Sequence, residues 1–292
     1  MSDTVGVFES HRPSLVALAY RMLGDVGRAE DIVQDAWLRW QDHSEAVENP
    51  KAFLVTVVTR LCLNELDSAR ARREESRSDR LPEPVDLTRG GLDEIEAADQ
   101  ISMAFLVVLQ KLTPAERAVL ILREVFDFEY GEIAALVNKS EAACRQLLKR
   151  ARENVSAEKR ALESTPEEHR RLVDAFVDAV RAGDVESLTR LLADDAVVIA
   201  DGGEHGVRFG RVRNLPRPLS GVARIAAFLV SVSRREGGVE THVRELNGRP
   251  ALVAVRDGRT VAAVHLSVAD GKIRHVFIHA DPAHLGHVGS VN

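Results

Sequence analysis

Residues 130–152 read YGEIAALVNKSEAACRQLLKRAR, and this stretch predicts two helices joined by a tight turn. The first helix has a narrow inner face of aliphatic side chains at helical spacing. Asn138 stands where the turn needs a left-handed residue, a conformation that asparagine tolerates better than most residues. Ser140 can cap the second helix, and Cys144 and Leu148 give that helix a narrow apolar face for packing.

The outer face of the second helix suits duplex DNA. Small residues at its start permit close approach to a groove, whereas Arg and Gln can make bidentate contacts to base edges and basic groups can hold phosphates. The residues expected there, with the cap, are Ser140, Glu141, Ala142, Arg145, Gln146, Lys149 and Arg150. Taken alone, the stretch also fits an ordinary helical hairpin with a solvated basic face.

Charge along the chain limits how such a helix could work. The 292 residues carry a formal net charge of −6. Only the window 139–160 is clearly basic, with seven basic against three acidic residues. Because phosphate neutralisation supplies most non-specific affinity for DNA, we expect weak binding by the chain alone and a partner that delivers it.

Two helices are expected upstream. Residues 29–40, AEDIVQDAWLRW, place apolar side chains at the i, i+3, i+4, i+7 positions of one buried face. The opposite face suits a basic partner through Asp31, Gln34 and Asp35, with Arg39 nearby. The second helix, after Pro50, offers polar and basic groups to a melted DNA strand. These groups are Arg60, Asn64, Arg70, Arg72 and Arg73.

The chain changes character towards its end. Residues 76–95 are charged and punctuated by proline and a glycine pair, as is typical of a linker. After about residue 163, short Val- and Ile-rich segments alternate with three turn pairs, Asn247-Gly248, Asp257-Gly258 and Asp270-Gly271. Such pairs are strong hairpin signals. The sequence therefore predicts an all-helical front joined to an α+β tail.

On these residues, the front of the chain resembles the extracytoplasmic-function group of the sigma-70 family. AEDIVQDAWLRW resembles the region 2 helix that docks on the β′ clamp helices of RNA polymerase. ENPKAFLVTVVTRLCLNELDSARARR (48–73) resembles the helix beside the melted −10 element. LTPAERAVLILREVF (112–126) with the helix-turn-helix resembles region 4, which reads the −35 element and touches the β flap. The resemblance implies RNA polymerase core and promoter DNA as partners.

LPEPV (81–85), SEAACRQL (140–147) and the tail resemble a narrower SigJ-like subgroup, which carries a cone-shaped α+β SnoaL-like domain of the polyketide-cyclase superfamily. The fold implied is multidomain, with two all-α sigma domains before this domain. The implied divisions are region 2 at 1–75, a linker at 76–95, region 4 at 96–163 and a SnoaL-like regulatory domain at 164–292. A DGGGK-type motif matters in that subgroup. Asp201, Gly202 and Gly203 match it and are predicted to be regulatory, whereas Glu204 and His205 depart from it.

The alternative to a regulatory tail is an enzymatic one. Acid–base chemistry could be carried out there by Asp201, His205, His265, His275 and His279. Scattered histidines are a poor signal, so we expect no catalytic residue, no cofactor and no metal site, while the tail's cavity could take a small ligand. Without an apolar span or secretory signal, a cytoplasmic location and no membrane partner are expected. A ligand-sensing helix-turn-helix regulator is the alternative function, although it has no use for helix 29–40.

Overall fold

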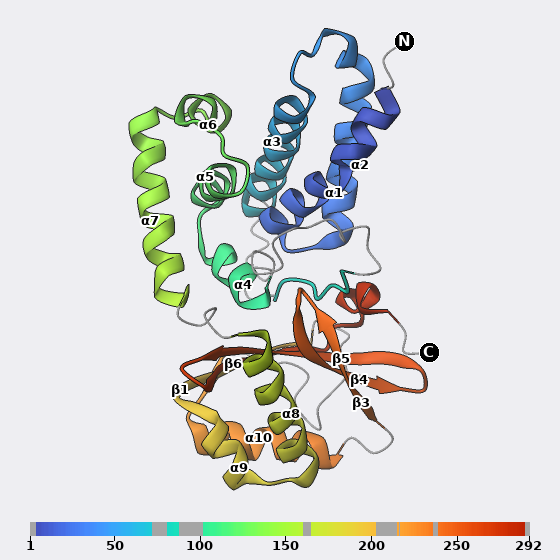
Figure 1. The fold of residues 1–292 in the computed structure, drawn as a ribbon, viewed down its shortest axis with the longest axis vertical. Coiled ribbons are helices and arrows are strands. Elements are labelled where there is room, and N and C mark those ends of the chain that lie inside the picture. The colour runs from blue at the N-terminus through green and yellow to red at the C-terminus, as the bar shows by residue number, and fades with distance from the viewer. Residues whose placement is uncertain are drawn as a thin grey trace. The chain divides into compact units, whose positions relative to one another are not determined.

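The computed structural model describes residues 4–71, 81–87, 102–159, 165–202, 215, 217–235 and 239–289. The chain divides into two compact units (Figure 1). The described residues up to 71 and from 106 to 157 form the helical unit. Residues 81–87, residues 102–105 and all described residues from 165 onward belong to the second unit, which we call the tail unit.

The helical part of the chain follows the predicted amphipathic pattern. Its helices are α1 (Thr4–Leu23), α2 (Val26–His43), α3 (Pro50–Ala71), α4 (Met103–Lys111), α5 (Pro114–Glu124), α6 (Tyr130–Val137) and α7 (Glu141–Lys159), with a short 3-10 turn, η1 (Ser44–Ala46). Asp25 caps α2 by accepting a bond from the Arg28 amide at 2.9 Å. The apolar stripe of α2 is buried as expected, except that Trp37 is half-buried, with its ring tilted against that of Phe8 at 4.9 Å between centres.

The predicted helix-turn-helix is confirmed by its caps and turn. Thr113 and Glu116 form a reciprocal capping box with proline at the first position of α5. Asn138 ends α6 in the left-handed region at φ 51°, and the Ser140 hydroxyl accepts a bond from the Ala143 amide at 3.2 Å. Cys144 is fully buried, and this burial raises the pKa of its thiol, so the side chain packs as a small core residue.

A buried arginine joins the two ends of the helical unit. Arg117 of α5 is only 6% exposed, and its Nε donates to the Leu109 carbonyl at 2.8 Å. Its Nη1 donates to the carbonyl of Met22 in α1. Burial lowers the pKa of Arg117 to about 10, so the group is still charged at neutral pH. Because a buried charge needs such partners, this residue holds α5 against α1.

The tail unit is a six-stranded sheet with helices on one face (Figure 1). The strand order is β2-β1-β6-β5-β4-β3, and β1 and β6 pair in parallel while the other neighbours are antiparallel. The strands are β1 (Leu192–Asp201), β2 (Leu219–Ser220), β3 (Glu240–Leu246), β4 (Arg249–Arg256), β5 (Arg259–Ala269) and β6 (Lys272–His279). The helices are α8 (Pro166–Ala182), α9 (Val185–Leu191) and α10 (Val222–Arg235), and two 3-10 turns follow, η5 (Pro282–His284) and η6 (Gly286–Val288).

The three predicted hairpin turns are confirmed by their backbone angles. Asn247-Gly248, Asp257-Gly258 and Asp270-Gly271 all have positive φ at both residues, from 51° to 73°. Two successive left-handed residues make the type I′ turn that matches the twist of paired strands. The observed order, a series of helices followed by a unit of mixed helices and strands, agrees with the predicted fold class of all-α domains before an α+β domain. Helix α10 was not among the predicted elements.

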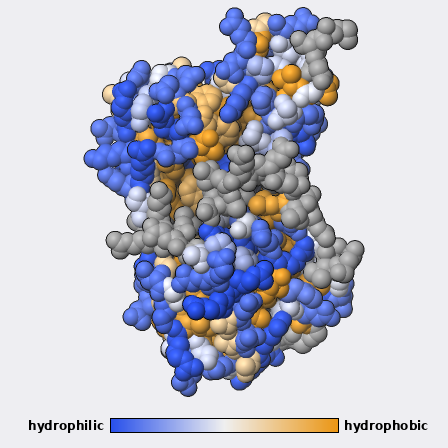
Figure 2. Space-filling view, viewed as in Figure 1, coloured by the Kyte–Doolittle hydropathy of each residue, from blue (hydrophilic) through white to orange (hydrophobic). Residues whose placement is uncertain are grey.

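Strand alternation gives the sheet two different faces. Val198, Val276 and Ile278 belong to the core beneath the helices, with Leu252 and Leu266 from the neighbouring strands. The other face carries a second small core and the polar side chains of β1, β5 and β6. On the molecular face in Figure 2, hydrophilic residues predominate and hydrophobic patches are separate. None of the described helices is long and apolar enough to cross a membrane.

Candidate functional surfaces

The acidic face of α2 is exposed as predicted. Asp31, Gln34, Asp35 and Arg39 all lie on the solvent side of the helix. Leu38 lies among them with 55% of its surface exposed, seven residues after Asp31 and so on the same helix face. Leu38 was not among the predicted contact residues, although this spacing could have identified it. An exposed leucine within an acidic patch is a suitable contact for a partner that is both basic and apolar.

The structure describes only some of the α3 residues that were predicted to bind the melted DNA strand. Arg60 and Asn64 are exposed and lie four residues apart, which places them on one face of the helix. Arg70 lies in the last turn of α3, whereas Arg72 and Arg73 lie outside the described residues. The structure therefore brings together the first two groups of the predicted set.

All seven predicted DNA-facing residues around α7 are exposed. The best-defined of them is Arg145, whose Nη2 donates to Glu141 at 2.8 Å. Its guanidinium also lies over the ring of Tyr130, 4.7 Å from the ring centre, and Arg123 lies 5.3 Å from the same centre. Tyr130 was not among the predicted site residues. Its ring holds Arg145 in a defined position by a cation–π contact.

The other basic groups of α7 make weak ion pairs. Lys149 lies 3.9 Å from Glu153, and Arg150 lies 3.3 Å from Glu116. Both basic side chains are more than half exposed. An exposed pair such as that of Lys149 contributes about 0–1 kcal/mol, so Lys149 can exchange it readily for a phosphate contact, whereas the Glu116 partner of Arg150 is only 8% exposed.

Residues 81–87, which we call the docked segment, are bound to the tail sheet through the backbone. The Leu81 amide donates to Asp201 Oδ2 at 3.1 Å. Val85 and Asn247 form a reciprocal pair, with the Val85 amide donating to Asn247 Oδ1 at 3.1 Å and the Asn247 amide donating to the Val85 carbonyl at 2.8 Å. The Asp86 amide donates to the His287 carbonyl at 3.2 Å.

Two buried carboxylates of the docked segment also have partners in the tail unit. Asp86 Oδ2 lies 2.5 Å from Arg244 Nη2, and Glu83 Oε1 lies 2.6 Å from His287 Nδ1. Glu83 and Asp86 are 3% and 5% exposed. Breaking a buried pair of this kind is costly, because it leaves one charge without compensation. The docked segment is therefore part of the tail's structure.

Of the three predicted regulatory residues, Asp201 is one of the groups that bind the docked segment. It ends β1, is 3% exposed and accepts the Leu81 amide described above. Gly202 follows it directly, and Gly203 lies outside the described residues. The residue pair Asp201 and Leu81 is separated by 120 positions in the chain, a contact that the sequence did not predict.

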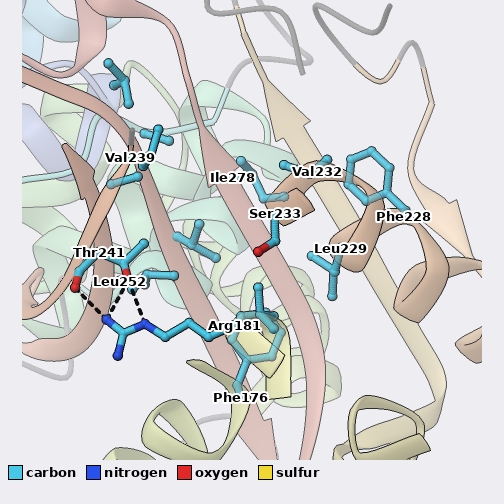
Figure 3. A pocket seen from close by; sticks show the side chains of 15 residues that line it. Phe176, Arg181, Phe228, Leu229, Val232, Ser233, Val239, Thr241, Leu252 and Ile278 are labelled. Carbon is cyan, nitrogen blue, oxygen red and sulfur yellow. Dashed lines mark hydrogen bonds between the residues drawn. The ribbon is translucent and has the colours of Figure 1, made fainter. Parts of the chain in front are cut away.

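The tail cavity lies on the helix face of the sheet, between α8, α10 and strands β3 to β6 (Figure 3). Its volume is about 230 Å³, and most of its lining side chains are apolar. The weighed acid–base candidates Asp201, His265, His275 and His279 alternate onto the opposite face of the sheet. His205 lies outside the described residues. Within the described residues, the cavity wall therefore offers no carboxylate or imidazole for acid–base chemistry.

Two histidines on the opposite face, His265 and His279, are buried and neutral. The rings of His265 and His279 meet edge to face, 5.2 Å between centres. Both ring nitrogens of His265 lack a hydrogen-bond partner within the described residues. Burial lowers the pKa of His265 to about 3, and burial also lowers the pKa of His279. These groups behave as packed aromatic side chains at neutral pH.

Comparison with known proteins covers both parts of the chain. Residues 7–72 match the model of sigma-70 region 2, and residues 102–155 match that of sigma-70 region 4. The ECF RNA polymerase sigma factor SigJ of Mycobacterium tuberculosis is 35% identical over 237 residues, covering 80% of this chain and 74% of the relative. A probable ECF sigma factor of that organism, SigI, is 30% identical over 282 residues, covering 95% and 93%. The crystal structure of SigJ superimposes with a TM-score of 0.78 at 30% identity, covering 97% of this chain and 98% of that chain.

Proposed function

Because the chain belongs to the extracytoplasmic-function sigma factors of the sigma-70 family, which direct RNA polymerase to promoters, we propose a division of labour among its surfaces. Helix α2 binds the polymerase core, α3 and α7 contact promoter DNA, and the tail restrains the separation of regions 2 and 4. The observation that carries the regulatory part is the docked segment, which links the tail to the chain between those regions.

The exposed face of α2 provides the polymerase contact. Asp31 and Asp35 supply negative charge, Gln34 adds a hydrogen-bonding group, and Leu38 adds apolar surface to the patch. A basic partner surface such as the β′ clamp helices would neutralise the carboxylates and bury the leucine together. The β flap, which the family resemblance assigns to region 4, would form a second contact.

Promoter contacts follow from the two exposed polar helices. Arg145 and Gln146 lie in the recognition helix of region 4 and can reach base edges of the −35 element, with Lys149 and Arg150 on phosphates. Arg60 and Asn64 of α3 are positioned for the melted −10 strand. Because the chain is acidic overall, its polymerase partner supplies the binding energy that places these residues on DNA.

The compact helical unit has to open before both elements can be read. By their numbering, the −10 and −35 elements lie about 25 base pairs apart, roughly 85 Å of B-form DNA. A compact unit of about 140 residues is only on the order of 40 Å across. Regions 2 and 4 must therefore separate, breaking the buried bond between Arg117 and Met22.

The tail acts on this opening through the docked segment. Its residues lie in the connection between α3 and α4, so docking attaches the tail to the chain between the two regions. The tail also follows directly after α7. It therefore forms a second connection between region 2 and region 4, in addition to the linker, and restrains their separation while it is docked.

We leave catalysis by the tail out of the proposed function, since the sigma factors are not an enzyme family and the acid–base candidates that the structure describes lie on the sheet face opposite the cavity. Promoter-directed transcription places the protein with polymerase and DNA in the cytoplasm. A ligand-sensing regulator reading an operator is not favoured, since it leaves the exposed acidic face of α2 without a use.

The polymerase contact is tested by reversing its charge. The double variant Asp31→Lys with Asp35→Lys should lose binding to purified core polymerase and transcription from a cognate promoter, because like charges then meet across the interface. Thermal unfolding should change little, since both side chains are exposed.

A matched control uses another exposed acidic pair with the same spacing. Asp174→Lys with Asp178→Lys on α8 makes the identical change of charge in the tail. This control should bind the core normally. Normal holoenzyme assembly by the α2 variant, or equal loss in both variants, would show that the polymerase contact lies elsewhere.

A further inference from the structure

We propose that the tail cavity binds a small neutral molecule, mostly apolar and carrying one hydrogen-bonding group, such as a substituted phenol. This site is separate from the polymerase, DNA and docked-segment contacts, and goes beyond the function proposed above. The residues that form it come from α8, α10 and strands β3 to β6 (Figure 3).

The walls of the cavity are hydrocarbon. Phe176 from α8 and Phe228 from α10 approach it from the helices, and Leu252, Val264 and Ile278 line its floor on the sheet. Within the described residues, the one charged group of the lining is Arg181. Arg181 is exposed, so a charged molecule in the interior would lose its hydration without a buried counter-charge, and the interior selects for neutral ligands.

The size of the cavity limits the ligand to about one substituted ring. A cavity of about 150 Å³ lined by Leu, Ile and Phe takes benzene. The 230 Å³ of the tail cavity is about half as large again, enough for a ring with one or two substituents.

One polar atom faces the cavity with its bonding capacity free. Ser233 Oγ points into the space between α10 and the sheet (Figure 3), and it makes no hydrogen bond to another described residue. Arg181, by contrast, is already engaged, because its Nε and Nη2 donate to Thr241 Oγ1 and the Thr241 carbonyl. The serine hydroxyl is therefore the group that would select a ligand carrying a hydroxyl or carbonyl oxygen.

Three probes of one shape test the proposal: p-cresol, p-xylene and p-toluate. Calorimetric titration of the full chain, without polymerase, should show p-cresol binding most tightly and p-toluate at least ten-fold more weakly than p-xylene. Ser233→Ala should leave p-xylene unchanged and reduce the affinity for p-cresol by about 2–10-fold, the value of one neutral hydrogen bond. Because polymerase is absent, failure here is distinguishable from failure of the sigma-factor assignment of each surface.

A filling variant locates the site. Ala254→Leu adds side-chain volume inside the cavity and should abolish binding of both neutral probes, whereas Ala283→Leu, on an exposed turn, should not. If Ala254→Leu fails to fold, the Ser233→Ala comparison decides alone. Absence of binding by both neutral probes, equal binding of p-toluate, or binding unaffected by both cavity substitutions would overturn the proposal.

Discussion

Removing the Asp201 carboxylate should loosen the docked segment by a calculable amount. In Asp201→Ala, the amide of Leu81 loses a charged acceptor 3.1 Å away. Because Leu81 is only 4% exposed, water cannot readily replace that acceptor. A hydrogen bond to a charged group contributes about 1.5–3 kcal/mol to stability. At about 1.4 kcal/mol per factor of ten, the opening equilibrium of the segment should rise by about 10–150-fold.

Hydrogen–deuterium exchange of the peptide containing residues 81–87 measures this opening directly. The amides of Leu81, Val85 and Asp86 all donate to tail groups, so each exchanges only when its bond opens. In Asp201→Ala we expect exchange of the Val85 and Asp86 amides to accelerate by that factor, and the Leu81 amide, which has lost its acceptor, to lose its protection. Initiation from a cognate promoter by core polymerase should increase as well, because undocking removes one of the two connections between regions 2 and 4.

Asp195→Ala is the matched control, since it removes a carboxylate from the same strand. Asp195 pairs with Arg274 on the surface, with 61% of its side chain exposed. Loss of such a pair costs about 0–1 kcal/mol, so exchange of the docked segment should change by less than about five-fold. Unchanged protection in a folded Asp201→Ala protein would refute the assignment of this carboxylate, and lower transcription would mean that docking assists initiation.

Two further predictions concern the recognition helix and acid stability. Arg145→Ala should weaken discrimination among −35 variants, measured by promoter competition, by about 1–3 kcal/mol. Tyr130→Leu should weaken this discrimination by a smaller amount in the wild-type protein and should have no further effect in the Arg145→Ala variant. Tyr130→Phe keeps the aromatic ring and should leave the discrimination unchanged. Burial lowers the pKa of His169 to about 4, below its ordinary 6.5, so its contribution to stability is complete above pH 6.5 and is lost as pH falls towards 4. At pH 5 the loss is about 2 kcal/mol for this residue, and urea unfolding should show a smaller pH dependence in His169→Asn; equal pH dependence in both proteins would contradict the burial argument.

Local signals in the sequence predicted most of the fold. The turn pairs of the tail require two left-handed residues, and only a few residue types tolerate that conformation, so the hairpins could be placed to within a residue or two. The capping box at Thr113 and the left-handed Asn138 fixed the helix-turn-helix in the same way. Helix α10 was missed although Ile225, Ala226 and Leu229 have helical spacing, because its three valines and one isoleucine also suit a strand.

The surfaces depend on contacts that no local pattern encodes. The docked segment reads as a solvated linker because it contains proline and two acids, yet Glu83 and Asp86 are buried through partners more than 150 positions away. Alternation placed His275 and His279 on one face of a strand, but it could not say which face the helices cover. The face on which the helices pack decides whether these histidines line the cavity, and that face is set by the packing of the whole tail unit.

The docked tail should limit the separation of regions 2 and 4 by degree and should not block it completely. Undocked, regions 2 and 4 are joined by the 31 residues between α3 and α4, which reach about 110 Å when extended, more than the roughly 85 Å between promoter elements. When the segment is docked, the path from region 2 to region 4 through the tail has three parts. The chain from Ala71 to Leu81 reaches about 35 Å when extended, the tail unit spans about 36 Å, and the chain from Lys159 to Thr165 reaches about 20 Å. Together these reach about 90 Å, so a docked tail still permits promoter spacing, but only with both short connections almost fully extended. Such extension costs conformational entropy in every residue involved. The strength of docking should therefore set how readily the promoter elements are engaged, and contacts such as that of Asp201 would change transcription by degree.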